Sequence, residues 1–162
     1  MENWKIDRIG SAERGENTTV MVKMKSGFAV IGDNQFLPGY CLLLGYPKVS
    51  SLNELDYFKR SQFLLDMTII GDAILEVCNA LRINYSLLMN LDNYLHAHIE
   101  ARYDWEPEEY RCRPTYSYPK EQRYIEEFEY SEDRYGYLKV KITDKIIEIM
   151  NRIDYWFSQN DY

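Results

Sequence analysis

The only two histidines of the chain lie two residues apart, at His96 and His98. Around them, residues 94–103 read Tyr-Leu-His-Ala-His-Ile-Glu-Ala-Arg-Tyr, with polar and apolar residues alternating up to Arg102. A β-strand sends alternate side chains to opposite faces, so the pattern predicts a strand whose apolar face enters the core. The other face then carries one row of polar side chains: Tyr94, His96, His98, Glu100 and Arg102.

This polar row is compatible with four kinds of surface. A sheet face that simply meets water would alternate in the same way. A His-x-His metal pair would need a third ligand, a carboxylate or a distant cysteine, because the chain has no other histidine. In a catalytic pair, one imidazole would attack a substrate while the other donates a hydrogen bond. The fourth possibility is a passive anion site made by His98 and Arg102, and the spacing leaves all four open.

The elements that position this row form an α+β pattern. Upstream, apolar patterning predicts three strands, at about 18–24, 28–31 and 40–46. Ser51 and Glu54 have the spacing of a capping box, and a helical apolar stripe follows over 63–81. Two further strands are predicted at about 83–89 and 94–103. The predicted fold class is therefore α+β: an antiparallel sheet of about five strands with one long helix, plus a C-terminal helical extension.

Composition changes near residue 103. Residues 103–162 have a net charge of −5 and hold 10 of the 15 tyrosines, whereas residues 1–102 have a net charge of −2. We therefore predict a core domain over 1–107 and an acidic, Tyr-rich helical extension over 108–162, packed on the core or on a dimer interface. Helices are predicted at 119–130 and from about 143, where an apolar stripe over 146–157 requires burial.

The composition of the whole chain limits its partners. Its net charge of −7 disfavours a nucleic acid polymer, since phosphate contacts supply most of the affinity of general binders. Three widely spaced cysteines without a CxxC pair are typical of reduced thiols in a cytoplasmic protein. The sequence shows neither an apolar signal region nor a run long enough to span a membrane, so we expect a cytoplasmic protein without a membrane partner.

The segment 94–103 resembles the histidine-triad signature, His-φ-His-φ-His-φ-φ with φ apolar, often continued by Pro-Arg-Tyr. Alignment on Arg102-Tyr103 places the triad positions at Tyr94, His96 and His98. Further matches are Pro38-Gly39, Asn84-Tyr85 and Asn90, so the resemblance covers about residues 15–107. It is strongest to the branch of bacterial diadenosine tetraphosphate hydrolases.

The resemblance implies a nucleotidyl hydrolase with a histidine nucleophile. His96, at the middle triad position, would attack the α-phosphate of a dinucleoside polyphosphate, and His98 would support it as a hydrogen-bond donor. An imidazole suits this reaction because its ordinary pKa of about 6.5 leaves it largely neutral and nucleophilic at cellular pH. The implied substrate-binding residues are Asp33 and Asn34 for the ribose, Asn90 and Arg102 for phosphate oxygens, and Tyr94 beside the nucleophile.

The sequence departs from the signature at three places. Tyr94 stands at the first triad histidine, Ala101 at the usual proline, and Tyr40 where many members have a histidine after Pro-Gly. A tyrosine donates a hydrogen bond but cannot become cationic. The alternatives are therefore a non-catalytic nucleotide-binding or interaction protein, or a nucleoside phosphoramidate hydrolase or nucleotidyl transferase.

The resemblance also implies a homodimer with a small-molecule nucleotide substrate. It implies no essential cofactor, and the sequence shows no dedicated metal site. The sequence leaves open whether a divalent metal accompanies the substrate phosphates.

Overall fold

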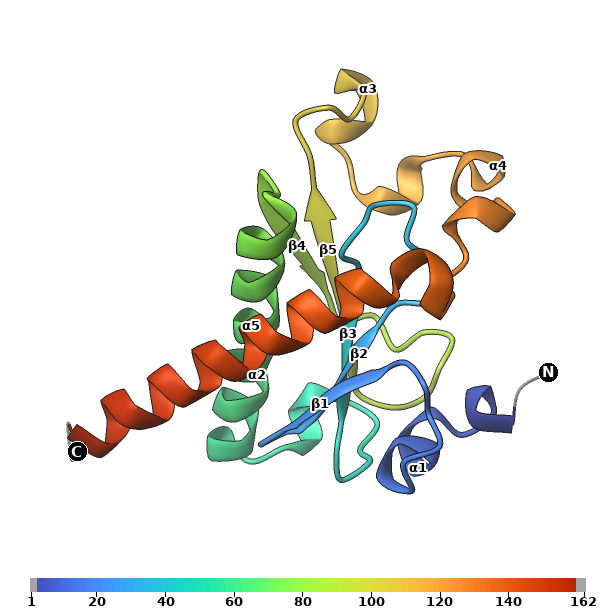
Figure 1. Ribbon diagram of the computed structural model, residues 1–162. Coiled ribbons are helices and arrows are strands. Elements are labelled where there is room, and N and C mark those ends of the chain that lie inside the picture. The colour runs from blue at the N-terminus through green and yellow to red at the C-terminus, as the bar shows by residue number, and fades with distance from the viewer. Residues whose placement is uncertain (1–2, 160–162) are drawn as a thin grey trace.

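The computed structural model describes residues 3–159. Its strands form one antiparallel sheet in the order β1-β2-β3-β5-β4 (Figure 1). They are β1 (Val20–Met24), β2 (Gly27–Ile31), β3 (Cys41–Gly45), β4 (Arg82–Ser86) and β5 (His96–Arg102). The predicted α+β class with a five-stranded antiparallel sheet is confirmed.

The long helix α2 (Tyr57–Cys78) lies across one face of this sheet. Phe63, Ile70 and Ile74 of the predicted apolar stripe are fully buried there, against the apolar face of β5. The predicted helix start at Ser51 is wrong for this helix, because Ser51 precedes only the short 3-10 turn η2 (Leu52–Glu54). Asp56 caps α2 instead, and its carboxylate accepts a hydrogen bond from the backbone N–H of Lys59.

The C-terminal helix α5 (Glu132–Gln159) packs on α2 and β1, on the same side of the sheet (Figure 1). It begins well before the predicted start near residue 143. Its early turns contribute to burial, because Leu138 and Ile142 enter the core together with Ile146 and Ile149. The two predicted segments, 1–107 and 108–162, thus share one hydrophobic core.

The predicted helix at 119–130 is wrong. This part of the chain forms only the short helix α4 (Lys120–Arg123) and the 3-10 turn η4 (Glu126–Phe128). The physical reason is that its backbone pairs with the loop after β2: the N–H of Gln35 donates to the carbonyl of Phe128, and the N–H of Tyr130 donates to that of Asp33. A continuous helix would use these groups internally.

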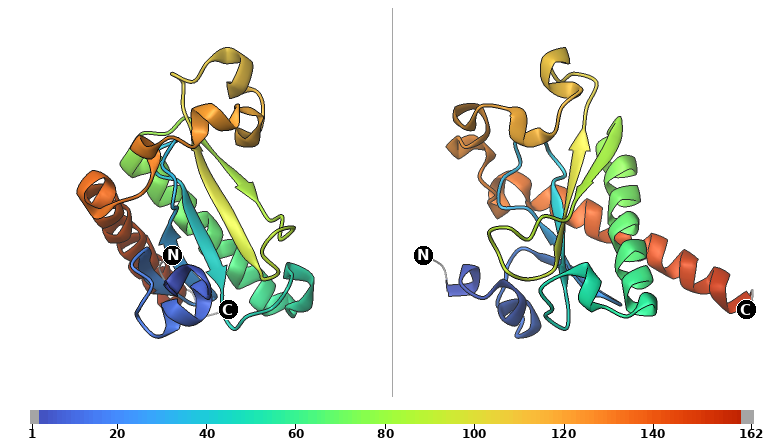
Figure 2. Two further views of the ribbon diagram at one scale, coloured as in Figure 1. Left: turned by 90° about the vertical axis from the view of Figure 1, so that its right-hand side faces the viewer. Right: turned by 180° about the vertical axis from the view of Figure 1, so that it is seen from behind.

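The opposite face of the sheet carries the row of polar residues. The short helix α1 (Arg8–Glu13) covers part of it, with Ile9 and Ala12 packed on β2 and β3. In the extension, α3 (Glu108–Arg111) lies at the other end of the molecule from α1 (Figure 2). The chain then passes through η3 (Thr115–Ser117) and α4 toward η1 (Asn3–Lys5), where Trp4 and Tyr124 line one cavity. Within residues 3–159, no helix is long and apolar enough to cross a membrane.

Candidate active site

β5 lies inside the sheet, between β3 and β4, so its side chains are held by neighbours on both sides. His96 is paired with Leu44, and His98 with Leu42 and Ser86. The row of polar side chains on β5 does not face water, because His96 is only 5% exposed and Arg102 only 2% exposed. The interpretation as a simple solvated sheet face is therefore wrong.

His96 has a defined tautomer. Its Nδ1 lies 2.8 Å from the backbone carbonyl oxygen of Tyr94. Because a carbonyl only accepts hydrogen bonds, Nδ1 carries a proton, so Nε2 is the ring nitrogen that can hold the lone pair. The ring lies between the rings of Tyr94 and His98, with centroid distances of 5.1 and 4.9 Å. The arrangement presents one imidazole nitrogen that is free to act as a nucleophile.

His98 is arranged as a neutral donor. Its Nδ1 lies 2.6 Å from the hydroxyl of Tyr40, whose pKa is raised far above its ordinary value, chiefly by burial. The phenol thus keeps its proton at neutral pH, and when it donates to Nδ1 the N–H of His98 lies at Nε2. Burial, and next the neighbouring His96, lower the pKa of His98 to about 4. At neutral pH His98 therefore offers an N–H without a positive charge.

The loop before β3 positions Tyr40. Gly39 has a φ of +90°, and a Cβ at this position would lie 2.7 Å from the Sγ of Cys78. The buried amide of Gln35 donates to the carbonyls of Gly32 and Tyr40 and accepts from the N–H of Gly39. The sequence analysis missed Gln35, since a single glutamine in a loop carries no recognisable spacing.

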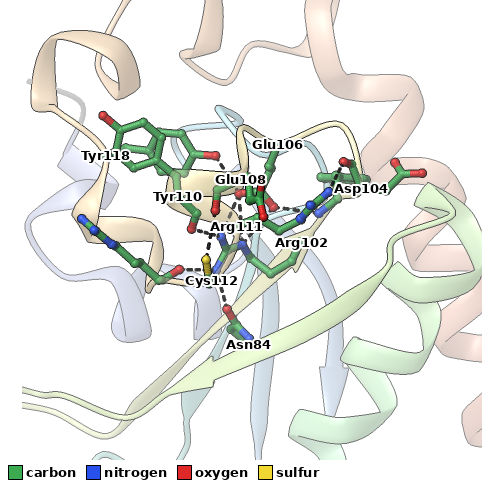
Figure 3. A network of polar contacts seen from close by, with 11 residues as sticks. Asn84, Arg102, Asp104, Glu106, Glu108, Tyr110, Arg111, Cys112 and Tyr118 are labelled. Carbon is green, nitrogen blue, oxygen red and sulfur yellow. Dashed lines mark hydrogen bonds and ion pairs between the residues drawn. The ribbon is translucent and has the colours of Figure 1, made fainter.

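The guanidinium of Arg102 is engaged by several other groups of the chain (Figure 3). Its guanidinium forms a buried ion pair with Glu106 at 2.8 Å and donates to Asn84 and to the carbonyls of Tyr110 and Arg113. Tyr118 donates to the same Glu106 carboxylate. The guanidinium of Arg102 thus ties β5 to the extension, and it would have to leave these partners in order to hold a substrate phosphate or to form an anion site with His98.

The other predicted residues are divided between the site and its surroundings. Tyr94 lies against His96, as its ring distance shows. Asp33 forms an ion pair with Arg8, whose two terminal nitrogens bond its two carboxylate oxygens. The Asn34 amide donates to the carbonyl of Arg123 and accepts from the N–H of Phe36, and Asn90 is exposed in the loop before β5.

A cavity of about 300 Å³ opens beside His98. Its wall includes Tyr40 and Glu100 from the sheet and Tyr116, Arg123 and Tyr124 from the extension. Across residues 3–159, no three His, Cys, Asp or Glu side chains come together as a group that could hold a metal ion. The extension was not predicted to line the site, although its interleaved arginines and tyrosines were a visible signal.

This fold, with a histidine pair on its central strand, is the fold of histidine-triad proteins. A histidine triad protein from Marinobacter aquaeolei VT8 is 15% identical and has a TM-score of 0.68, over 88% of this chain and 94% of its own. A histidine triad (HIT) protein from Sinorhizobium meliloti 1021 is 16% identical, with a TM-score of 0.66 over 82% of this chain and 93% of its own. No family model and no curated protein matches the sequence.

Enzymes occur among the structures with this fold. The Plasmodium falciparum diadenosine triphosphate hydrolase, solved with cyclomarin A, is 16% identical and has a TM-score of 0.56. The similarity covers 80% of this chain and 77% of the hydrolase. At these identities the similarity establishes the fold, and the chemistry must be argued from the site.

Proposed function

We propose that the protein is a nucleotidyl hydrolase that acts through a covalent nucleotidyl-His96 intermediate. The observation that carries the proposal is the ordered hydrogen bonding of the two imidazoles. The Tyr94 carbonyl accepts from Nδ1 of His96, and in this proposal the Tyr40 hydroxyl donates to Nδ1 of His98, which puts the N–H of His98 on Nε2. One ring thus offers a lone pair while its neighbour offers an N–H, as nucleophilic attack on a phosphate requires.

The reaction takes two displacement steps. In the first, the Nε2 lone pair of His96 forms a bond to the α-phosphorus, and the bond from phosphorus to the leaving group breaks with its electron pair on that group. In the second, water attacks the same phosphorus, the electron pair of the N–P bond returns to Nε2, and the water proton passes to solvent. His98 donates from Nε2 to the phosphoryl oxygens, where negative charge increases in each step.

Dinucleoside polyphosphates, such as diadenosine tetraphosphate, are the substrates that we propose first. In this proposal Tyr94 and Asn90 contact the phosphates, while Asp33 and Asn34 shape the loop near the ribose. No cofactor is essential, although a divalent metal can enter with the polyphosphate. A nucleoside phosphoramidate, or transfer of the nucleotidyl group to another acceptor, would use the same intermediate.

A non-catalytic nucleotide-binding protein is the second candidate. Two observations favour it: His96 is only 5% exposed, and tyrosines occupy the positions of Tyr40 and Tyr94 where the signature has histidines. A substrate phosphate must reach Nε2 of His96 past the rings of Tyr94 and His98. A measurement of turnover therefore distinguishes the hydrolase from the non-catalytic nucleotide-binding protein.

The test is turnover and trapping with a panel of dinucleoside polyphosphates and phosphoramidates. We expect His96→Ala to abolish turnover while it still binds nucleotide, because the phosphate and ribose contacts come from other residues. His98→Ala removes one donor, and we expect about a hundredfold loss of rate. Mass spectrometry after acid quench should place the nucleotidyl group on His96, with peptide fragmentation to separate it from His98.

Two results would contradict the proposal. Nucleotidyl label on His98, or undiminished turnover by His96→Ala, would refute the assignment of the nucleophile. Absence of turnover by the native protein across the panel would leave the nucleotide-binding candidate.

A further inference from the structure

The carboxylate expected at the ribose is already occupied in this chain. Arg8, from α1, bonds both oxygens of Asp33, one of them at 3.1 Å. Burial opposes the charge of Arg8, but the hydrogen bond to Asp33 prevails and raises the pKa of its guanidinium. A ribose that bound Asp33 would have to share this carboxylate with the cation.

A second carboxylate, Glu100, lies in the cavity beside His98. It follows His98 by two residues on the same face of β5, at a position where the histidine-triad signature has an apolar residue. Within residues 3–159, no cation forms an ion pair with Glu100. Its side chain is therefore a polar group in the cavity wall that is available to a ligand.

The charged neighbours of Glu100 include the guanidinium groups of Arg102 and Arg123, and Arg123 lines the same cavity. The guanidinium of Arg102 is held by Glu106, and the Nε of Arg123 donates to the carbonyl of Tyr118. Burial raises the pKa of Glu100, while the hydroxyl of Thr115 and the two guanidinium groups act in the opposite direction. The nearby Glu106 carboxylate adds to the rise. A ligand that donates hydrogen bonds would stabilise the ionised carboxylate here.

The rest of the cavity fits a nucleoside. Its volume of about 300 Å³ lies at the lower end of the range for small-molecule sites. Aromatic rings from Phe36, Tyr116 and Tyr124 stand in its wall, and such rings stack on bases of any sequence. The two oxygens of a carboxylate accept hydrogen bonds from vicinal ribose hydroxyls, as the acidic residue of dinucleotide-binding folds does.

We propose that Glu100 is the residue that binds the ribose hydroxyls, and that the cavity between β5 and the extension is the nucleoside site. The proposal rests on the nucleotide specificity of the proposed function, but it does not depend on turnover. It assigns the extension a direct part in recognition, because Tyr116 and Tyr124 belong to it. Asp33 has a structural role, as the partner of Arg8.

The experiment is calorimetric titration of the full chain with adenosine monophosphate and with its 2′,3′-dideoxy analogue. His96→Ala serves as the background for every variant, so that no turnover disturbs the measurement. We expect the ribonucleotide to bind ten to a hundred times more tightly than the dideoxy analogue, the range for hydrogen bonds to a charged group. Glu100→Ala should reduce this ratio to near one without weakening binding of the dideoxy analogue.

Three further variants test whether the ribose preference depends on Glu100 alone. Asp33→Asn should keep the ribose preference, because that carboxylate does not contact the ligand. Glu109→Gln, which changes an exposed carboxylate in α3, should change neither affinity. Tyr124→Ala should weaken both nucleotides about tenfold, through the loss of stacking.

The outcomes separate this inference from the proposed function. An unchanged ribose preference in Glu100→Ala, or its loss in Asp33→Asn, would overturn the assignment of Glu100 even if the native protein hydrolyses nucleotides. A ribose preference that depends on Glu100 in a protein without turnover would support the nucleoside site and refute the hydrolase. Failure of the folded protein to bind either nucleotide would overturn both proposals.

Discussion

At the scale of single residues, the tautomers of the histidine pair decide what the site can do. The Tyr94 carbonyl accepts from Nδ1 of His96, and the Tyr40 hydroxyl lies 2.6 Å from Nδ1 of His98, so each ring is held by one hydrogen bond. Tyr40 stands after Pro38-Gly39, where many members of the resembled family have a histidine, and it still forms a hydrogen bond with His98. A tyrosine at this position therefore preserves the orientation of the donor without adding a positive charge.

The depressed pKa of His98 predicts a loss of stability in mild acid. The folded protein holds this imidazole neutral down to a pKa of about 4, whereas the unfolded chain binds its proton near the ordinary value of 6.5. Stability from this residue is therefore complete above pH 6.5 and falls as the pH drops toward 4. The upper limit of the loss is about 3 kcal/mol, reduced by the partial exposure of the ring.

Urea unfolding at pH 7.5 and pH 5 would measure this effect. Carboxylates in ion pairs also lose stability in acid, so the comparison is with His98→Gln, which lacks the titrating ring. We expect the variant to lose less stability than the native protein between the two pH values. Equal losses would show that His98 does not titrate as its surroundings indicate.

At the scale of elements, the ion pair between Arg102 and Glu106 connects β5 with the extension through hydrogen bonds to the carbonyls of Tyr110 and Arg113 and from the hydroxyl of Tyr118 (Figure 3). Burial would raise the pKa of Glu106, but hydrogen bonds from Arg102, the Tyr103 N–H and Tyr118 lower it overall. The carboxylate is therefore ionised inside the protein. Its partner cation is equally buried, with side-chain exposures of 3% for Arg102 and 0% for Glu106.

We predict that Glu106→Gln is strongly destabilising. The variant leaves the Arg102 cation buried without a counter-ion, which costs about 3–5 kcal/mol in comparable pairs. Glu109→Gln, in the same segment but exposed, should change the free energy of unfolding by less than about 0.5 kcal/mol. Chemical denaturation of both proteins tests this, and a Glu106→Gln protein as stable as the native one would contradict it.

The helix α5 is expected to be required for the fold. Ile142→Ala should cost about 2–5 kcal/mol, because it opens a cavity in the core shared with α2. Ile147→Ala makes the same chemical change on the same helix at a 42% exposed position, and it should cost much less. Thermal melts of the pair would distinguish them, and equal losses would show that α5 does not pack as described.

Removal of the whole extension tests its contribution to the fold more severely than a single substitution does. A chain that ends at Pro107 lacks the four buried α5 residues and exposes the surfaces of α2 and β1 that they cover. We expect it to be poorly soluble and to unfold without cooperativity. A soluble fragment that melts as sharply as the full chain would refute this prediction.

At the scale of the whole molecule, β4 is an edge strand, and α5 packs beside the other edge at β1. The N–H and C=O groups on the outer side of an edge strand can pair with a second chain. Exposed apolar side chains lie on and beside β4, at Leu81, Tyr85 and Leu88. These features agree with the homodimer that the family resemblance implies.

We predict a homodimer in solution. Light scattering at micromolar concentration should give twice the monomer mass of 19.4 kDa. Dilution across a wide concentration range would serve as the control for weak association. A mass of 19.4 kDa throughout that range would contradict the prediction.

The strand that carries the histidines could be assigned from the sequence alone. Strict alternation from Tyr94 to Arg102 assigned its two faces, and buried Ala97, Ile99 and Ala101 confirm the apolar one. The apolar stripe of α2 could be predicted in the same way, because residues on one helix face recur with a period of 3.6 residues. Local periodicity reports which side chains share a face, but it did not report that His96 and Arg102 on the polar face are buried as well.

Which polar side chains remain available to a ligand depends on the tertiary structure. In the sequence, Asp33, Glu100 and Arg102 are three charged residues whose partners no motif identifies. The fold brings Arg8 to Asp33 across 25 residues and encloses Arg102 with Glu106, while it leaves Glu100 in the wall of the cavity. Whether a charge is paired depends on how the folded chain arranges its side chains, and the periodicity of the sequence does not report that arrangement.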